Sequence, residues 1–340
     1  MSKKLKVGLV ARADNSGLGI LSWDLSKNLD FDKIMVVSAE YPTDFERYDE
    51  EKTTICDRGI PSLYEIKTFL EGLDVVLTLE TPYNWNFYKI AREMGVKTAL
   101  MVMYEWTPPQ KKMPSEPDMY LCPTQLDFDT LWGNKKLVPV PVNRREVEFK
   151  ERTQAKTFIF NNGHGGYGGR NSLQEFLYAI QMVKADVKFI IRTQVPMDES
   201  IRDSRIEIQM GEVDYDKLWK EGDIYIHAHK FDGLSLPLQE ALSAGYPVIA
   251  VDRDPYNTIL PKEMLFKPDA EYEVQLPLRS IKAVTINPRT LADKIEEFAA
   301  MPNEKIKELS NKSDELAKEM SWSKLKSVYE QTFQELYEGK

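Results

Sequence analysis

Histidine and cysteine are scarce in this chain. Its 340 residues include three histidines, His164, His227 and His229, and two cysteines, Cys56 and Cys122. So few histidines disfavour a Ser-His-Asp hydrolase and a zinc site made of three histidines. Two cysteines cannot form a disulfide framework, and their spacing is not that of metal ligands. We therefore expect a reducing compartment and chemistry that relies on carboxylates, arginines and backbone amides.

Long apolar runs are also missing. No stretch approaches the roughly 18–20 apolar residues that a membrane-spanning helix needs, so we expect no transmembrane segment. The apolar run that follows the basic N-terminal residues ends at Arg12, which is too short for the core of a signal peptide. Both observations favour a cytoplasmic location.

Basic residues are outnumbered by acidic ones, 45 to 54, which gives a net charge of −9. A protein that binds nucleic acid or anionic membranes through its overall charge normally has the opposite balance. The composition therefore disfavours such partners, although a local basic patch can still form.

The length and the pattern of the chain predict two α/β domains and a final helix, with boundaries at 1–145, 146–320 and 321–340. Apolar runs that alternate with helical patterns indicate βαβ units and a parallel, doubly wound sheet in each domain. A linker is expected within 135–154, which carries two prolines and many charges. The expected strands are 6–12, 34–38, 74–79, 97–103, 119–122, 157–161, 187–192, 205–209, 224–228 and 247–251, and the expected helices are 18–28, 62–71, 84–94, 172–182, 215–221, 236–244 and much of 288–336.

A glycine-rich loop follows the first expected strand of the second domain. Five of the chain's 17 glycines lie in the segment NNGHGGYGGRNS, between Gly163 and Gly169. Backbone amides of such a loop, together with the N-terminus of the next helix, can hold a phosphate, and Arg170 would add a full charge. Ser172 and Glu175 have the spacing of a capping box at that helix start. The alternative is a flexible surface hairpin that is rich in glycine.

A second glycine loop, DNSGLG at 14–19, lies between the first strand and the first helix. Ligands of doubly wound domains bind at this position. The loop falls short of a full dinucleotide fingerprint, so a dehydrogenase is disfavoured. The alternative is an ordinary tight turn.

Two carboxylates stand eight residues apart in the segment that follows the expected strand 224–228. Asp232 lies in the loop, Ser235 can cap the next helix, Pro237 fits its first turn, and Glu240 lies within it. Both carboxylates would then face one crevice, where they suit the paired hydroxyls of a sugar or a ribose. The alternative is one loop acid and one acid on a helix surface.

This segment resembles the donor-site signature of the family 4 glycosyltransferases. The family pattern is Glu-Gly-Phe-Gly-Leu-Pro-x-x-Glu-Ala followed by Gly-x-Pro-Val-Ile, and this chain has DGLSLPLQEA at 232–241 and GYPVI at 245–249. The likeness extends to Gly211-Glu212-Val213 and to Ser321-Trp322. It implies an α/β protein with the GT-B fold, in which two Rossmann-like domains face each other across a cleft and the last helix returns to the N-terminal domain.

The resemblance also implies roles for individual residues. Glu240 matches the acid that binds the ribose of the sugar nucleotide, and Asp232 matches the acid that contacts the transferred sugar. Arg170 matches a cation on the diphosphate, and Arg192 is a further candidate for that contact. The other positions that match donor-binding residues are Gly17, Leu18, Gly19, Gly163, His164, Gly233, Leu234 and Ser235.

Three positions depart from the family pattern. Asp232 replaces glutamate, His164 stands where arginine is usual, and Glu105 lies near the position of a histidine that approaches the donor sugar. We therefore take Asp232, Arg170 and Glu105 as the catalytic candidates.

The reaction implied by the resemblance is sugar transfer from a UDP- or GDP-sugar to a hydroxyl, with retention and without metal or other cofactor. The leaving phosphate can accept the proton, so histidine is not required. If the reaction inverts, Glu105, Glu80 and Asp14 are the candidate bases.

The acceptor is a saccharide, a lipid-linked glycan or a protein side chain, with a nucleic-acid base less favoured by the net charge. The rival functions are a sugar-nucleotide epimerase and a non-catalytic protein that binds nucleotides or glycans. The sequence leaves the oligomeric state open.

Several other patterns have ordinary interpretations. Asp-x-Asp at 127–129, 214–216 and 252–254 is expected by chance in an acidic chain, and His227-x-His229 is interpreted as a strand end that lines the cleft rather than as a metal site. Tyr83–Tyr88 is either core or a platform for the acceptor. Basic pairs occur at 111–112, 135–136 and 144–145; they are interpreted as solvated surface, with contact to an anionic acceptor as the alternative.

Overall fold

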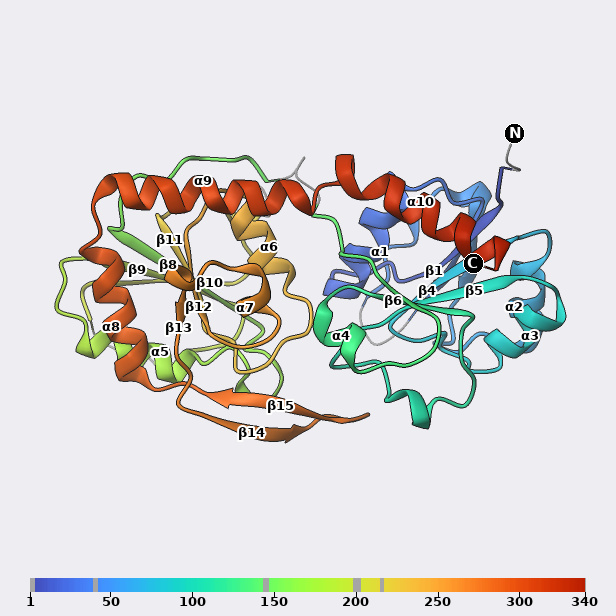
Figure 1. The fold of residues 1–340 in the computed structure, drawn as a ribbon, viewed down its shortest axis with the longest axis horizontal. Coiled ribbons are helices and arrows are strands. Elements are labelled where there is room, and N and C mark those ends of the chain that lie inside the picture. Colours follow the sequence, from blue (N-terminus) through green and yellow to red (C-terminus); the bar gives the residue numbers. More distant parts are fainter. Residues whose placement is uncertain (1–3, 39–41, 143–146, 198–202, 215–216, 340) are drawn as a thin grey trace. The chain divides into compact units, whose positions relative to one another are not determined.

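The computed structural model describes residues 4–38, 42–142, 147–197, 203–214 and 217–339. Its contacts divide the chain into two units (Figure 1). The first unit contains Met1–Pro141, Leu276–Arg279 and Trp322–Lys340, and the second contains Val142–Gln275 and Ser280–Ser321. The expected boundary at 145–146 and the basic pair at 144–145 lie outside the described residues.

The first unit is built on a seven-stranded sheet in the order β3-β2-β1-β4-β5-β6-β7, and every neighbouring pair is parallel. Its strands are β1 (Val7–Ala11), β2 (Lys33–Val37), β3 (Thr53–Cys56), β4 (Val75–Leu79), β5 (Lys97–Met101), β6 (Met119–Cys122) and β7 (Lys135–Leu137), and its helices are α1 (Gly17–Asn28), α2 (Leu63–Leu70), α3 (Phe87–Glu93), α4 (Gln125–Asp129) and α10 (Trp322–Glu338). Strands β1 and β4 are buried along their whole length, because helices cover both faces of such a sheet. Strand β7 lies within the expected linker, so the linker prediction is wrong at its start.

Helix α10 packs on the first unit. Trp322 donates from Nε1 to Oδ2 of Asp24 in α1 at 2.8 Å, and the hydroxyl of Tyr329 donates to the carbonyl of Pro139 at 3.0 Å. Lys136 and Glu335 form an ion pair. These bonds attach the last helix to α1 and to the segment after β7.

The second unit is built on a six-stranded parallel sheet in the order β10-β9-β8-β11-β12-β13. Its strands are β8 (Thr157–Gly163), β9 (Lys188–Thr193), β10 (Ile206–Met210), β11 (Ile224–His227), β12 (Val248–Val251) and β13 (Leu265–Phe266), and its helices are α5 (Leu173–Met182), α6 (Leu236–Ser243), α7 (Tyr256–Ile259), α8 (Pro288–Ala299) and α9 (Asn303–Glu319). Helix α5 packs on α8, and α6 packs on α9 (Figure 1). Strands β14 (Ala270–Gln275) and β15 (Ser280–Thr285) form an antiparallel hairpin. The strand order is that of a doubly wound, Rossmann-like sheet.

Two local expectations differ from the structure. Residues 217–220 form a turn rather than the end of a helix, and 215–216 lie outside the described residues. Ser172 precedes α5 but has φ +58° and caps no amide, so the predicted capping box is absent. Glu175, its expected partner, instead pairs with Lys230 at 2.6 Å. The left-handed backbone at Ser172 differs from the extended conformation that a capping residue normally needs.

Cys56 and Cys122 are buried and free. Within the part of the chain that the structure describes, no helix is both long enough and apolar enough to pass through a membrane.

Candidate functional site

The candidate site of the second unit lies at the carboxyl ends of β8, β11 and β12. These three strands are neighbours in the sheet, so the loops that follow them meet at one edge. The strand order reverses between β8 and β11, and ligands of doubly wound sheets bind at this switch point. The three loops carry the glycine-rich segment, Asp232 and Arg253 respectively.

The glycine-rich loop after β8 has the backbone geometry that its sequence suggests. All five of its glycines have positive φ, a conformation that other residues seldom adopt. At Gly166 a side chain would also collide with Asn171, because a Cβ there would lie 2.6 Å from Oδ1. His164 is exposed. The loop therefore carries five residues without side chains at the sheet edge, where their backbone amides are accessible to a ligand.

Hydrogen bonds join this loop to the loop that follows β11. The amide of Lys230 donates to the carbonyl of Arg170 at 2.8 Å, and the ammonium of Lys230 pairs with Glu175 in the first turn of α5. This link places Arg170 close enough to Asp232 for its charge to lower the pKa of that carboxyl. The structure thus brings together two residues that are 62 positions apart in the sequence.

Asp232 is a buried, ionised carboxylate. Its side chain accepts a hydrogen bond from Nδ1 of His229 at 2.9 Å, and Arg253 donates to its backbone carbonyl at 3.3 Å. Burial alone would raise the pKa of Asp232, but the bond from His229 and the charge of Arg170 hold it well below its usual range. The carboxylate is therefore available as an acceptor at neutral pH.

Two imidazoles in contact with each other lie beside this carboxylate, their planes tilted by 41°. The rings of His227 and His229 are 3.9 Å apart between centroids, and Nε2 of His227 lies 2.9 Å from the hydroxyl of Tyr256. Burial lowers the pKa of both rings, and in His227 the neighbouring His229 lowers it further. Both histidines are thus neutral, and because ionised Asp232 can only accept, His229 carries its proton on Nδ1.

These three residues also have the arrangement of a possible metal site. Ligand atoms of His227, His229 and Asp232 all lie within 4.8 Å of one another. The charges of Arg170 and Arg253 reach the same side chains and lower the pKa of both histidines. Two guanidinium groups beside one carboxylate oppose a divalent cation and favour an anion.

Glu240 lies in α6 beside a pair of aromatic rings. Its Oε2 accepts from Nε1 of Trp219 at 3.3 Å, and the Trp219 ring packs edge-on against Tyr225 at 5.2 Å. Burial raises the pKa of the Tyr225 hydroxyl, and the charges of Glu240 and Asp232 raise it further. Both carboxylates therefore lie close enough to Tyr225 of β11 for their charges to act on it, and a shared crevice stays a prediction.

Arg192 is held by the protein itself. It is 4% exposed, and its guanidinium donates to Gln209 at 2.8 Å, to Glu221 at 3.0 Å and to the carbonyl of Leu218. These bonds fasten the turn that carries Trp219. A contact with a phosphate stays a prediction for this residue.

Several buried polar atoms around the site have no hydrogen-bond partner among the described residues. They are Oγ of Ser172, Oγ of Ser235, Oδ1 of Asn171 and Nη1 of Arg253. Ser235 begins α6 without capping it by its side chain, contrary to expectation. Burying such atoms unpaired is costly, so they point to a polar ligand. Arg253 was not predicted as a site residue, although the sequence holds one signal for it, a basic residue two positions after the expected strand 247–251.

Gly233 and Leu234 lie in the loop between Asp232 and α6, and the remaining predicted site residues belong to the first unit. Gly17, Leu18 and Gly19 form the first turn of α1, where the amide of Gly19 donates to Oγ of Ser16 at 3.2 Å. A Cβ on Gly19 would lie 2.1 Å from the carbonyl oxygen of Asp14. Gly19 is therefore required for this tight turn, and contact of Gly17, Leu18 and Gly19 with the donor stays a prediction.

The three candidate bases of the first unit differ in their surroundings. Asp14 is ion-paired with Arg12 at 2.6 Å, and Glu105 is 6% exposed in the turn after β5. Glu80 follows β4 with φ +65°, and burial raises its pKa to about 7 against the opposing charge of Arg12.

The chain is similar to solved glycosyltransferase structures. It matches a glycosyltransferase from Rickettsia africae with a TM-score of 0.72 and 13% identity, over 100% of both chains. It matches Anabaena Alr3699/HepE, solved with UDP and glucose, with a TM-score of 0.69 and 10% identity, over 97% of this chain and 100% of that one. It matches the sucrose-phosphate synthase of Thermosynechococcus elongatus with a TM-score of 0.67 and 11% identity, over 99% of this chain and 100% of that one. The sequence matches no protein-family model and no curated protein.

These likenesses identify the fold. Two parallel α/β sheets with this strand order, matched over nearly the whole chain, form the GT-B fold of glycosyltransferases. The fold predicted from the resemblance is confirmed.

Proposed function

We propose that this protein is a glycosyltransferase that moves a sugar from a nucleotide-diphosphate sugar to an acceptor hydroxyl. The observation that carries the proposal is the convergence, at the switch point of the second sheet, of Asp232, Arg170 and several unpartnered buried polar atoms. The second unit would hold the donor. Support comes from the GT-B fold and from a structural neighbour that was solved with UDP and glucose.

The proposed roles follow from charge. Arg170, Arg253 and the amides of the glycine-rich loop would stabilise the diphosphate as it leaves. The Asp232 carboxylate, oriented by His229, would accept hydrogen bonds from the hydroxyls of the transferred sugar. Glu240 would accept from the ribose. This set supplies charge stabilisation without a protein nucleophile.

We propose that transfer proceeds with retention and without metal or other cofactor. The bond between the anomeric carbon and the phosphate oxygen breaks, the acceptor oxygen bonds to the same face, and the acceptor proton passes to the leaving phosphate. Two guanidinium groups near Asp232 would supply the positive charge that a metal provides elsewhere. If the product is inverted instead, Glu80, whose pKa is about 7, becomes the base to test.

The acceptor that we propose is a saccharide or a lipid-linked glycan, with nucleic acid less favoured by the net charge of −9. We also propose a cytoplasmic location. Two buried free cysteines suit a reducing compartment.

The deciding experiment measures donor binding and turnover in matched variants. UDP, GDP and their sugars are screened by thermal unfolding without metal, since a ligand at 100 times its Kd adds about 2.7 kcal/mol of stability. Glu240→Ala should abolish the shift, and Arg170→Ala should lower the release of nucleoside diphosphate. Asp293→Ala and Arg289→Ala, which alter exposed charges of α8, are the controls.

Each failure has a distinct meaning. Unchanged donor affinity in Glu240→Ala would refute the site. Binding without release of nucleoside diphosphate with any acceptor would indicate a non-catalytic binding protein. Conversion of the donor without an acceptor would indicate an epimerase.

A further inference from the structure

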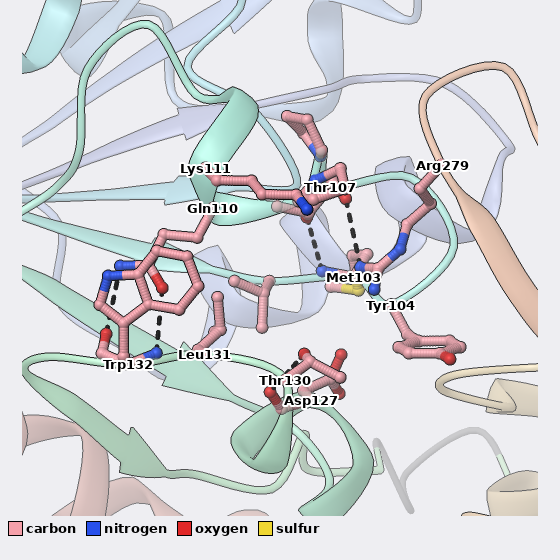
Figure 2. Close-up of a pocket in the computed structure, with 13 residues that line it drawn as sticks. Met103, Tyr104, Thr107, Gln110, Lys111, Asp127, Thr130, Leu131, Trp132 and Arg279 are labelled. Carbon is pink, nitrogen blue, oxygen red and sulfur yellow. Dashed lines mark hydrogen bonds between the residues drawn. The ribbon is translucent and has the colours of Figure 1, made fainter.

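A cavity of about 200 Å³ lies in the first unit, apart from the residues assigned to the donor (Figure 2). Its floor is formed by 102–104, which directly follow β5, and one wall is formed by Asp127 and Thr130, which follow the neighbouring strand β6. The cavity therefore opens at the carboxyl edge of a parallel sheet, where α/β folds bind their ligands. Its volume suits one small ring rather than a drug-sized molecule.

An aromatic platform stands at the rim of this cavity. The Trp132 side chain is 55% exposed, yet its backbone is held at both ends by one buried side chain. Its amide donates to Oε1 of Gln110 at 3.0 Å, and its carbonyl accepts from Nε2 of Gln110 at 3.2 Å. Nε2 of Gln110 also donates to Glu116 at 2.8 Å. The exposed indole, carried on a backbone that Gln110 holds in place, offers a face on which a ring can stack.

The charged groups of the cavity lie on two sides. Lys111 and Arg279 both reach toward Thr107, whereas Asp127 lies on the opposite side (Figure 2). Arg279 stacks on the Tyr104 ring at 4.6 Å and donates to the Thr107 carbonyl at 3.5 Å, while its buried Nε has no hydrogen-bond partner among the described residues. Because Lys111 and Arg279 are cationic and Asp127 is the one carboxylate among the lining residues, the cavity carries a net positive charge.

Asp127 is suited to bind hydroxyl groups. Its carboxylate is 2% exposed and accepts from the Thr124 hydroxyl at 2.7 Å. No basic side chain forms an ion pair with it among the described residues. Burial raises the pKa of Asp127 to about 6, with the bond from Thr124 and the charge of Arg279 opposing this change. The carboxylate is thus ionised at neutral pH and gains from hydrogen-bond donors.

We infer that this cavity binds the acceptor, and that the acceptor is a monosaccharide unit that carries a phosphate or a carboxylate group. The sugar ring stacks on Trp132, its hydroxyls donate to Asp127, and its anionic group pairs with Lys111 and Arg279. The inference rests on the proposed function and names the class of substrate. A nucleic-acid chain is disfavoured, because the protein has a net charge of −9.

The test compares three ligands that share one ring: glucose, glucuronic acid and a phosphate ester of glucose. Their affinities for the full-length protein are measured by titration calorimetry, with and without saturating UDP. We expect at least one anionic sugar to bind roughly tenfold more tightly than glucose. Tighter binding of glucuronic acid would identify the anionic group as a carboxylate, and tighter binding of the phosphate ester would identify it as a phosphate. Equal binding of all three, or no binding of any under either condition, overturns the inference.

Matched variants locate the binding. Lys111→Ala should weaken the anionic sugar about fivefold and leave glucose unchanged, as expected for an exposed ion pair. The neighbouring Lys112→Ala, which removes a lysine outside the cavity, should change neither. Trp132→Ala should weaken every sugar by roughly tenfold. An equal effect of Lys111→Ala and Lys112→Ala would place the anion elsewhere and refute the assignment.

Two outcomes of these binding measurements separate this inference from the proposed function. If UDP binds and no anionic sugar does, the acceptor assignment fails while the donor site stands. If an anionic sugar binds and no nucleotide does, the glycosyltransferase proposal fails while the cavity assignment stands. Tight binding of a single-stranded oligonucleotide in place of the sugars would also refute the inference.

Discussion

Protonation of His227 in the unfolded chain should make the second unit less stable at acid pH. The ring is fully buried, and burial together with His229 holds its pKa well below the ordinary value of 6.5. The native state therefore keeps the ring neutral, whereas the unfolded chain binds a proton below about pH 6.5. Because the unfolded state then binds more protons, stability falls as the pH falls.

The size of this effect follows from the unfolded pKa alone. At about pH 5.5, one unit below that pKa, the unfolded chain gains about 1.4 kcal/mol from protonation of one histidine. For a unit of roughly 150–250 residues this lowers Tm by about 3–6 °C. A variant that lacks the His227 imidazole should not show this loss of about 1.4 kcal/mol in folding stability at acid pH.

The perturbation is His227→Gln, whose amide can still reach the Tyr256 hydroxyl. The variant should be less stable than the parent at about pH 7.5, but it should lose about 1.4 kcal/mol less between about pH 7.5 and about pH 5.5. Scanning calorimetry at several pH values measures this difference. The control is His164→Gln, which removes an exposed ring and should leave the pH dependence unchanged. Parallel pH profiles for the parent and His227→Gln would refute the argument.

Two further predictions concern the first unit. Glu80→Gln should raise the stability of the first unit above about pH 7 but not at about pH 4. Burial raises the pKa of Glu80 in the folded protein to about 7, so the folded protein loses stability as the pH rises from the unfolded pKa to about 7. A stability gain that is the same at both pH values would contradict this. Gly19→Ala should destabilise the unit by about 1–3 kcal/mol in urea unfolding, because its Cβ would lie 2.1 Å from the carbonyl oxygen of Asp14; unchanged stability would mean that the turn can shift at little cost.

The strands near the centre of each sheet could be predicted because each is a short apolar run. β4 and β12 are buried along their whole length, so the sequence itself records their place in the fold. The hairpin of β14 and β15 could not be predicted, because five of the six residues of β14 and three of the six residues of β15 are exposed, so neither strand has a continuous apolar run. Its structure depends on cross-strand pairing together with burial of one strand only, β15.

The glycine-rich loop and the pair Asp232 and Glu240 were also evident from the sequence, because each motif lies within one strand, loop and helix. The expected capping box failed for a tertiary reason, since Glu175 pairs with Lys230 from another loop. A local pattern could not reveal this competing partner.

The neighbours of each functional group were decided only by the tertiary structure. Asp232 owes its ionisation to His229 and Arg170, and Arg253 reaches it from the next strand. The cavity beside Trp132 likewise combines side chains from three separate segments of the first unit. Turn geometry and hydrophobic periodicity act over a few residues and are visible in a sequence, whereas the environment that sets a charge or shapes a cavity comes from residues that meet only when the sheet edges are assembled.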